Sequence, residues 1–200
     1  MIGILNYGVG NLKAFSIVLK GLHTEYSIVD NEKDLKNCDK IILPGVGSFD
    51  SVMKRLNESG LKEVLSEQVL QNKIPVLGVC VGMQILAKSS EEGELEGLGW
   101  IPSRVVKFSF KNLSIPQIGW NEVKSKGNSK LFNNLNSESR FYFLHSYYIH
   151  CENNEHILAE TDYGGNFTCA VGRENIFGVQ FHPEKSHHNG VALIKNFTEI

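Results

Sequence analysis

The sequence predicts an α/β protein of three layers, in which helices cover both faces of a central mixed, largely parallel sheet. In the first half of the chain, short apolar runs alternate with segments whose apolar residues recur at helical spacing. This order is typical of parallel strands joined by helices. In the second half, strand-like runs follow one another with turn residues between them, which predicts antiparallel pairs as well. The 200 residues suffice for one domain with its own core, spanning residues 1–200.

The first half is expected to supply strands and helices in alternation. The strands lie at residues 2–5, 26–29 and 41–43, and a further one runs through 74–77 into a Gly-rich turn. The helices lie at 12–22, 49–56 and 61–69, where apolar residues recur every three or four positions. Ser48 suits the N-cap of the second helix, because its hydroxyl can accept a hydrogen bond from the first turn.

The second half is expected to be mostly strands. They lie at residues 104–110, 122–124, 141–144, 157–160, 168–171 and 176–180, and the turns use the Asn and Gly residues at 133–134, 153–154 and 164–166. A helix from about His188 closes the chain and buries Val191, Ile194 and Phe197. Ligands of such sheets bind at the carboxyl ends of strands, so residues that follow strands are the first candidates for a site.

Composition excludes several classes of protein. The 20 basic and 22 acidic residues leave a net charge of −2, which provides no electrostatic footprint for nucleic acid. The four cysteines, Cys38, Cys80, Cys151 and Cys169, have no Cys-x-x-Cys spacing, so neither a zinc site nor a redox motif is expected. Scattered cysteines in a chain of this length suit a reducing compartment. A metal site built on His182, His187 and His188 is disfavoured, because adjacent histidines diverge and no carboxylate pair completes the shell.

No targeting or membrane segment is expected. The N-terminus lacks a basic region before its first apolar run, as a signal peptide would require. The longest apolar stretch, residues 74–87, is too short and too rich in Gly to span a bilayer. We therefore expect a cytoplasmic protein without contact to membranes.

Residues 78–82 (GVCVG) are the first candidate for chemistry. They follow one apolar run and lead into another, which predicts a strand, a tight turn and a helix. This turn would place Cys80 at the end of the strand, as in a nucleophile elbow. The glycines allow a turn that side chains would obstruct. A helix N-terminus beside the sulfur would favour the reactive thiolate. The alternative is a buried structural cysteine in a Gly-rich turn.

His182-Pro183-Glu184 is the second candidate. A cysteine nucleophile needs a base, and the base needs an orienting partner. Pro183 favours an extended conformation at His182, and in extended chain residues two apart point to the same side. We therefore expect the Glu184 carboxylate beside the His182 imidazole. Alone, the segment would be a polar turn after a strand, but together with Cys80 it predicts a catalytic triad.

These segments, with four others, carry a family resemblance. The others are residues 6–12 (NYGVGNL), 43–49 (LPGVGSF), 119–121 (GWN) and 143–147 (FLHSY). The ordered set resembles the class I glutamine amidotransferases over the whole chain, and within them the glutaminase subunits of imidazole glycerol phosphate synthase. The resemblance implies an α/β/α amidotransferase domain that needs no cofactor and no metal.

The resemblance also implies the reaction and its partner. Cys80 would attack the side-chain amide of glutamine, His182 would move the proton, and Glu184 would orient the imidazole. A γ-glutamyl thioester would form and then be hydrolysed to glutamate. The ammonia would pass to a (β/α)8-barrel cyclase in a heterodimer, which forms imidazole glycerol phosphate and aminoimidazole carboxamide ribotide in histidine biosynthesis.

An oxyanion forms in such a reaction and requires preorganised donors. The backbone N–H of Val81, directly after the nucleophile, is one candidate. The loop 45–47 is the other, with the amides of Val46 and Gly47 as donors, because its glycines leave the peptides free to rotate. We expect partner docking to reorient one of these two amides. The alternative is an ordinary Gly-rich turn after a strand.

Further residues are assigned to substrate and partner by the resemblance. Those expected to contact or border the bound glutamine are Gly47, Gln84, Glu92, His145 and Ser146, and those expected to face the synthase partner are Asn11, Tyr142 and Lys185. Gln84 lies four residues after Cys80, hence one helical turn along the same face. Without the resemblance, Glu92 would belong to a solvated acidic loop, and His145 would be a satisfied core histidine.

Three other functions remain open from the sequence. A paralogous glutaminase could supply ammonia to an enzyme that amidates surface-polysaccharide sugars. A cysteine hydrolase of similar fold could act alone and would turn over without a partner. A regulatory module that has lost catalysis would not need Cys80, His182 and Glu184 together.

Overall fold

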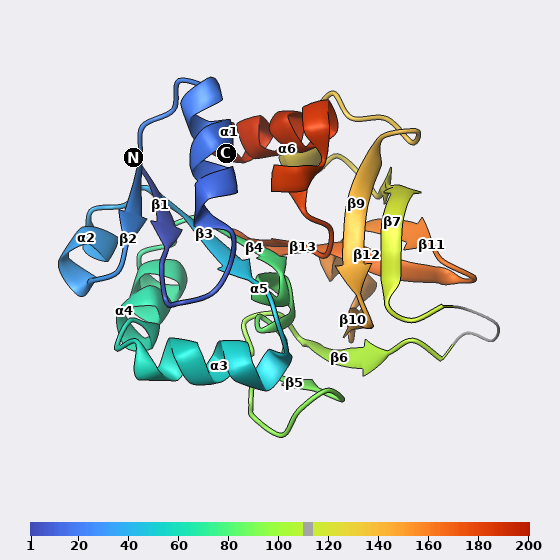
Figure 1. Ribbon diagram of the computed structural model, residues 1–200, viewed down its shortest axis with the longest axis horizontal. Helices are drawn as coiled ribbons and strands as arrows, with labels where there is room; N and C mark the ends of the chain where they lie inside the picture. The colour runs from blue at the N-terminus through green and yellow to red at the C-terminus, as the bar shows by residue number, and fades with distance from the viewer. Residues whose placement is uncertain (110–113) are drawn as a thin grey trace.

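A long mixed sheet runs through the centre of the computed structural model, which describes residues 1–109 and 114–200, and helices pack on both of its faces (Figure 1). The strands are β1 (Ile2–Leu5), β2 (Tyr26–Val29), β3 (Lys40–Gly45), β4 (Val76–Cys80), β5 (Ser89–Ser90), β6 (Ser103–Lys107), β7 (Gln117–Glu122), β8 (Lys124–Ser125), β9 (Arg140–His145), β10 (Tyr147–Cys151), β11 (Ile157–Asp162), β12 (Asn166–Arg173) and β13 (Ile176–Val179). The helices are α1 (Leu12–Gly21), α2 (Glu32–Lys36), α3 (Phe49–Glu58), α4 (Lys62–Ser66), α5 (Val81–Gln84) and α6 (His187–Glu199), with short 3-10 or π turns η1 (Glu67–Gln71), η2 (Lys130–Phe132), η3 (Asn154–His156) and η4 (Pro183–Lys185).

The order of strands in the main sheet is β2-β1-β3-β4-β13-β12-β10-β6-β5. The strands from β2 to β13 are parallel, and β12, β10 and β6 continue the sheet in antiparallel pairs. The last strand along the chain, β13, therefore returns to the centre of the sheet and pairs with β4. The predicted mixed, largely parallel sheet between helices is confirmed.

The helices form two layers around the parallel half of the sheet. Helices α1 and α6 lie together on one face, and α3 and α4 lie on the other (Figure 1). Each helix buries an apolar stripe, such as Phe49, Val52, Met53 and Leu56 of α3. The Ser48 side chain accepts a hydrogen bond from the backbone N–H of Ser51, so the predicted N-cap is confirmed.

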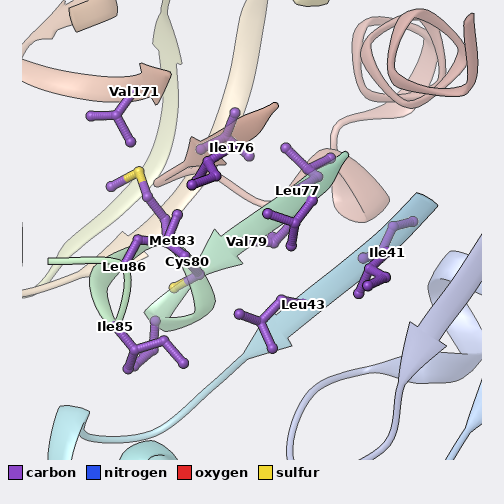
Figure 2. Packing of buried hydrophobic residues seen from close by; sticks show 14 of the residues in the cluster. Ile41, Leu43, Leu77, Val79, Cys80, Met83, Ile85, Leu86, Val171 and Ile176 are labelled. Atoms are coloured by element: carbon purple, nitrogen blue, oxygen red, sulfur yellow. The ribbon is translucent and has the colours of Figure 1, made fainter. Parts of the chain in front are cut away.

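The core is densest where β3, β4 and β13 meet. Figure 2 shows Ile41 and Leu43 of β3 beside Leu77 and Val79 of β4, with Cys80 at the end of β4. All four apolar side chains are at most 1% exposed. Burial of such side chains stabilises the fold by roughly 1.5–3 kcal/mol each. The end of β4 is consequently a rigid platform for the residue that follows it.

A separate antiparallel pair, β7 and β9, lies beside the main sheet (Figure 1). The strand β9 of this pair was predicted, but β7 was not located correctly. The expected strand 122–124 spans the end of β7 and the start of β8. That expectation was wrong in its bounds, since Val123 is a buried residue between two strands rather than the centre of one. The alternation of Ile118 and Trp120 is short, and it does not mark a core-facing strand, since Ile118 is exposed and Gln117 is buried.

Other expected elements hold with small changes. The closing helix is α6 and buries Ile194 and Phe197, but Val191, which was expected to be buried, is 37% exposed. The predicted strand 104–110 corresponds to β6, and its last residue, Phe110, lies outside the described residues. The predicted helix 61–69 is α4 continued by the π turn η1. The strands β5 and β10 and the helix α2 were not predicted. The turn at Gly164, with φ +68°, joins β11 to β12 as expected.

Candidate active site

Cys80 lies on a sharp turn between β4 and α5. It is the last residue of β4 and the N-cap of α5, and its φ of 55° and ψ of −114° are rare for a residue with a side chain. A Cβ on Gly78 would lie 2.5 Å from the Gly82 carbonyl oxygen, and a Cβ on Gly82 would lie 2.0 Å from the carbonyl oxygen of Leu43. The predicted elbow and its need for both glycines are therefore present in the structure.

One part of the elbow prediction changes. The helix α5 contains only Val81–Gln84, so the macrodipole at its N-terminus is that of a single turn and contributes little to a charge on the sulfur. Stabilisation of a thiolate at Cys80 must therefore come from other groups.

His182 and Glu184 meet as predicted, although by a different backbone. The Nδ1 atom of His182 lies 2.8 Å from Oε1 of Glu184. His182 itself is extended, with φ −99° and ψ 93°, but Pro183–Lys185 form the 3-10 turn η4. The expectation of continuous extended chain was wrong, and the turn brings the carboxylate back beneath the ring. Oε2 of Glu184 is buried and has no hydrogen-bond partner among the described residues.

The His182 imidazole is held in its charged form. Burial lowers its pKa, but hydrogen bonds to Cys80 and to Glu184, together with their negative charges, outweigh burial and raise the pKa to about 10. A carboxylate can only accept a hydrogen bond, so Nδ1 carries the proton that faces Glu184. The Nε2 atom is therefore free to exchange its proton with groups in the pocket.

Ser186 fixes the position of the His182 backbone. Its hydroxyl donates to the His182 carbonyl oxygen at 2.6 Å and accepts the N–H of Tyr142 at 3.0 Å. The N–H of His182 donates in turn to the carbonyl oxygen of Tyr142 at 2.9 Å. Two of these hydrogen bonds join β9 to the segment 182–186, and the third braces that segment internally, a role for Ser186 that sequence reasoning missed.

Cys80 and His182 open into one cavity of about 260 Å³. Its lining residues are Val46, Gly47, Cys80, Val81, Gln84, Glu92, Pro116, Leu144, His145, Ser146, Tyr147, His182 and Lys185. Every residue predicted to bind substrate or an oxyanion is among them. Glu184 is not, which places it behind His182 rather than in the cavity.

The loop 45–47 lies directly against the elbow. A Cβ on Gly45 would be 2.1 Å from the backbone nitrogen of Gly82, so only glycine allows this approach. Gly47 has φ +103°, and a Cβ there would meet no atom within 4 Å. Val46 between them is 43% exposed. The loop is therefore packed against the elbow at Gly45, whereas Gly47 has open space around it.

Glu92 does not belong to a solvated loop. Its Oε2 atom accepts the N–H of Phe49 at 2.8 Å, at the start of α3. The residues after it are held by Asp50, whose carboxylate accepts the N–H groups of Glu94 at 3.0 Å and Leu95 at 3.1 Å. This clasp brings Glu92 to the cavity with its second oxygen still available, and the contribution of Asp50 was not predicted.

The Tyr147 carbonyl oxygen orders two polar side chains in the cavity. It accepts hydrogen bonds from Nδ1 of His145 at 2.8 Å and from Nε2 of Gln84 at 3.0 Å. Gln84 also donates to Oε1 of Gln180 at 3.0 Å, and Nε2 of Gln180 lies 3.7 Å from the sulfur of Cys80. Gln180 is fully buried, and no sequence signal distinguished it from an ordinary residue at the end of a strand.

His145 is a neutral histidine at the edge of the cavity. Burial, with a smaller contribution from the nearby charge of His182, lowers its pKa to about 4, despite the hydrogen bond to Tyr147 that favours the charged form. Along β9, His145 lies on the buried face with Phe141 and Phe143, opposite Tyr142 and Leu144. Its Nε2 atom is buried and has no partner in the described structure.

The geometry of a cysteine elbow beside a His-Glu pair agrees with the matches to known proteins. A profile of the family described as glutamine amidotransferase class-I covers residues 4–200. The chain belongs to the class I glutamine amidotransferases. It is 64% identical to a protein of Leptospira borgpetersenii named imidazole glycerol phosphate synthase subunit HisH, and the alignment covers all of both chains. A protein of Bdellovibrio bacteriovorus with the same name is 50% identical, again over the full length of both.

Solved structures of amidotransferases share the fold. A crystal structure of a glutamine amidotransferase superposes with a TM-score of 0.78 at 21% identity, covering 99% of this chain and 97% of that one. A structure of PurLQS from Thermotoga maritima superposes with a TM-score of 0.74 at 17% identity, again covering 99% and 97%. At these identities the likeness concerns the fold alone.

The amidotransferase has an exposed face of mixed character beside the cavity. On the pair β7 and β9, Ile118 lies opposite Leu144 and Trp120 lies opposite Tyr142. Ile118 is 61% exposed and Leu144 is 39% exposed, and Leu144 also lines the cavity. The Lys185 ammonium lies 5.8 Å from the centre of the Tyr142 ring. Two of the predicted partner residues, Tyr142 and Lys185, are thus neighbours on this face.

Asn11, the third predicted partner residue, begins α1 and caps it by accepting the N–H of Ala14 at 3.2 Å. The preceding Gly10 lies against the Pro44 side chain, and the Tyr7 hydroxyl donates to the Pro44 carbonyl oxygen. Asn11 is exposed. Gly10 and Tyr7 connect its segment to Pro44, which leads into residues 45–47. It does not line the cavity.

Neither a metal cluster nor a membrane-spanning helix is found in the described parts of the chain. Within residues 1–109 and 114–200, no group of three or more His, Cys, Asp or Glu side chains is arranged to hold a metal ion. Over the same ranges, none of the helices has the length and apolar character that crossing a bilayer would need.

Proposed function

We propose that this amidotransferase is the glutaminase subunit of an imidazole glycerol phosphate synthase, with Cys80 as its nucleophile. The observation that carries the proposal is the juxtaposition of the Cys80 elbow with the buried His182–Glu184 pair at one cavity. The names of the full-length relatives supply the reaction in which the ammonia is used.

The first half of the reaction forms the thioester. The Cys80 sulfur attacks the carboxamide carbon of glutamine, and the carbonyl oxygen takes the negative charge. The N–H of Val81 and an amide of Val46 or Gly47 stabilise this oxyanion, and each such donor typically contributes about 3–4 kcal/mol. Nε2 of His182 then gives its proton to the leaving nitrogen, and ammonia departs.

The second half returns the enzyme to its starting state. His182, now neutral, removes a proton from water, and the resulting hydroxide attacks the thioester carbon. The bond to sulfur breaks, glutamate leaves, and the proton remains on His182. Glu184 holds the Nδ1 proton throughout and stabilises the imidazolium at both stages.

Substrate glutamine would be oriented by acceptors in the cavity. Both N–H bonds of the Gln84 amide are engaged by Tyr147 and Gln180, so its oxygen is the atom left for a ligand. One oxygen of Glu92 is likewise available beside it. Acceptors and a negative charge at this end suit the α-ammonium group of an amino acid.

The partner would cover the face formed by Ile118, Trp120, Tyr142 and Leu144, together with Lys185 and Asn11. Exposed apolar side chains rimmed by polar groups are typical of a protein interface. Because Leu144 and Lys185 belong both to this face and to the cavity, a partner bound here would receive ammonia before it reaches water. A (β/α)8-barrel cyclase is the partner that we propose.

The test measures glutamate release from glutamine by the chain alone and by the chain mixed with the cyclase subunit and its ribonucleotide substrate. We expect little release without the partner, strong stimulation in the mixture, and loss of both in Cys80→Ala. No glutamate release in the mixture would favour an amidotransferase with another acceptor for the ammonia, such as an enzyme that modifies polysaccharide sugars. Rapid turnover by the chain alone would favour an independent hydrolase.

A further inference from the structure

Gln180 directly follows the end of β13 and lies beside the nucleophile. The parallel strands β4 and β13 pair in register, with Gly178 opposite Gly78 and Val179 opposite Val79. The next residues along these strands are Gln180 and Cys80, so the strand pairing places them side by side. Gln180 is 0% exposed, and its backbone N–H donates to the Cys169 carbonyl oxygen at 2.8 Å. The pairing of β13 with β4 and this bond to β12 therefore fix the position of its backbone.

The hydrogen bonds determine which way each amide points. The Tyr147 carbonyl oxygen can only accept, so the atom of Gln84 at 3.0 Å from it must be the amide nitrogen. That same nitrogen faces Gln180 at 3.0 Å, so the atom of Gln180 at this position must be the oxygen. The other end of the Gln180 amide is then the nitrogen, and it faces the Cys80 sulfur at 3.7 Å. The Tyr147 carbonyl oxygen thereby orients the Gln84 amide. Gln84 in turn orients the Gln180 amide, so that its N–H faces the Cys80 sulfur.

A donor at Gln180 would add to the stabilisation that the charged His182 gives the Cys80 sulfur. The other contact of this sulfur outside the triad is the Leu144 carbonyl oxygen at 3.9 Å, an acceptor that disfavours negative charge on sulfur. The helix α5 is too short to contribute a strong dipole. A hydrogen bond from an uncharged donor to an ionised acceptor is stronger than one between neutral groups.

We propose that Gln180 donates a hydrogen bond to the Cys80 thiolate, and that Gln84 and the Tyr147 carbonyl hold it in the donating orientation. This inference rests on the proposed role of Cys80 as nucleophile. The Gln180 amide stabilises the thiolate and restrains the sulfur at the end of β4. Gln84 then has two roles, since its nitrogen orients Gln180 while its oxygen faces the ligand.

The experiment measures the rate of Cys80 alkylation by iodoacetamide as a function of pH, using the chain alone. Peptide mass spectrometry identifies the modified cysteine, and Cys80→Ala is the blank. Burial raises the pKa of Cys151 to about 12 and also raises the pKa values of Cys38 and Cys169. These thiols therefore react slowly near neutral pH, where only the thiolate is nucleophilic.

Two substitutions of Gln180 distinguish the effect of its N–H donor from the effect of its side-chain volume. Gln180→Met keeps the length and removes the N–H, and Gln180→Glu keeps the acceptor for Gln84 but turns a carboxylate oxygen toward the sulfur. We expect the midpoint of the pH profile to rise by about one pH unit in Gln180→Met, and by at least as much in Gln180→Glu. A residue that served only packing would leave the midpoint unchanged.

Gln84→Met tests the orientation without touching Gln180. It frees the Gln180 amide to rotate, so the midpoint should rise in the same direction by a smaller amount. In the double variant, Gln84→Met should add nothing to the shift of Gln180→Met, because both act through one hydrogen bond. If Gln180→Met fails to fold, as judged by circular dichroism, Gln84→Met still decides the matter.

The outcomes distinguish the inference from the function on which it rests. Unchanged midpoints in Gln180→Met and Gln84→Met, with a reactive Cys80 in the unsubstituted chain, would overturn the role of Gln180 and leave the glutaminase intact. A Cys80 that does not react in the unsubstituted chain at any pH would overturn the nucleophile itself, and the inference with it.

Discussion

The Nδ1 atom of His182 lies 2.8 Å from Oε1 of Glu184, and the two side chains are only 3% and 2% exposed. In such a dry setting a charge pair is stronger than in water, because little solvent screens it. The pair is also separated by one residue in sequence, and the η4 turn brings the two side chains together. The orientation of the proposed base is therefore a local property of the turn that follows β13.

Replacing Glu184 by Gln should abolish most of the activity while preserving the fold. The amide keeps the shape but cannot stabilise an imidazolium, and its N–H can favour the wrong tautomer of His182. We expect partner-stimulated glutamate release to fall by about 10³- to 10⁴-fold. A reduction of less than tenfold in that assay, with a thermal unfolding midpoint like that of the unsubstituted protein, would contradict the role of Glu184.

Replacing Glu92 by Gln should weaken the binding of glutamine. The Gln oxygen can still accept the Phe49 N–H that Glu92 accepts at 2.8 Å, so the clasp with α3 remains. What is lost is the negative charge that faces the α-ammonium group. We expect KM for glutamine to rise about tenfold to a hundredfold with little change in kcat. Initial rates measured over a range of glutamine concentrations decide this, and an unchanged KM would remove Glu92 from the binding site.

His145 predicts a specific dependence of stability on pH. Its pKa is about 4 in the folded chain against an ordinary value of 6.5. Between these values the unfolded chain binds a proton that the folded chain does not, so the free energy of unfolding falls as the pH falls. The contribution is complete above pH 6.5 and is lost at up to about 1.4 kcal/mol per pH unit as the pH approaches 4.

His145→Asn is the matched control for this effect. Asn can still donate to the Tyr147 carbonyl oxygen, but it does not titrate. Urea unfolding at several pH values should show that the stability advantage of the unsubstituted chain shrinks as the medium becomes acidic. An advantage that stays constant from pH 6.5 to 4 would mean that His145 is not held neutral by burial.

Gly82 and Gly21 make a matched pair for the elbow. A Cβ on Gly82 would lie 2.0 Å from the Leu43 carbonyl oxygen, whereas a Cβ on Gly21 would meet nothing within 4 Å. The obstacle at Gly82 is backbone of β3 and cannot move aside. We expect Gly82→Ala to reduce the free energy of unfolding by about 3 kcal/mol or more, and Gly21→Ala to change it by less than about 1 kcal/mol. Equal stability of the two variants in urea would contradict the close packing of β3 on the elbow.

The partner face can be tested with two exposed apolar residues. Ile118 is 61% exposed on β7, beside the cavity, and Leu70 is 43% exposed on η1. η1 directly follows α4, on the opposite side of the molecule from β7 (Figure 1). Ile118→Glu should lower the affinity for the cyclase partner at least about tenfold, because it would bury an unpaired charge. Leu70→Glu should leave that affinity unchanged in the same titration, and an equal loss in both variants would remove β7 from the interface.

Much of the parallel half of the fold follows from local pattern. The apolar runs of β1, β3 and β4 and the helical spacing in α1 and α3 identify these elements because each is buried on one side or on both. The antiparallel half is harder to predict from the sequence. Strand β7 exposes Ile118 and buries Gln117, so its short alternation of apolar residues does not mark a core-facing strand.

The candidate site divides in the same way. Cys80 lies in a short segment whose residue types suggest chemistry, and His182 and Glu184 do so once they are considered together with it. Gln180 and Tyr147 do not, since their contributions depend on the register of β13 with β4 and on one backbone carbonyl. Such contacts join residues far apart in sequence, and only the assembled sheet brings them together.

The central claim is that Cys80 is the nucleophile for glutamine, and covalent labelling tests it most directly. A chloroketone analogue of glutamine is incubated with the chain in the presence of its cyclase partner, and the labelled peptide is identified by mass spectrometry. We expect label on Cys80 alone, slowed by excess glutamine and strongly reduced in Glu184→Gln. Label on Cys38, Cys151 or Cys169, or labelling of Cys80 that glutamine does not slow, would contradict the claim.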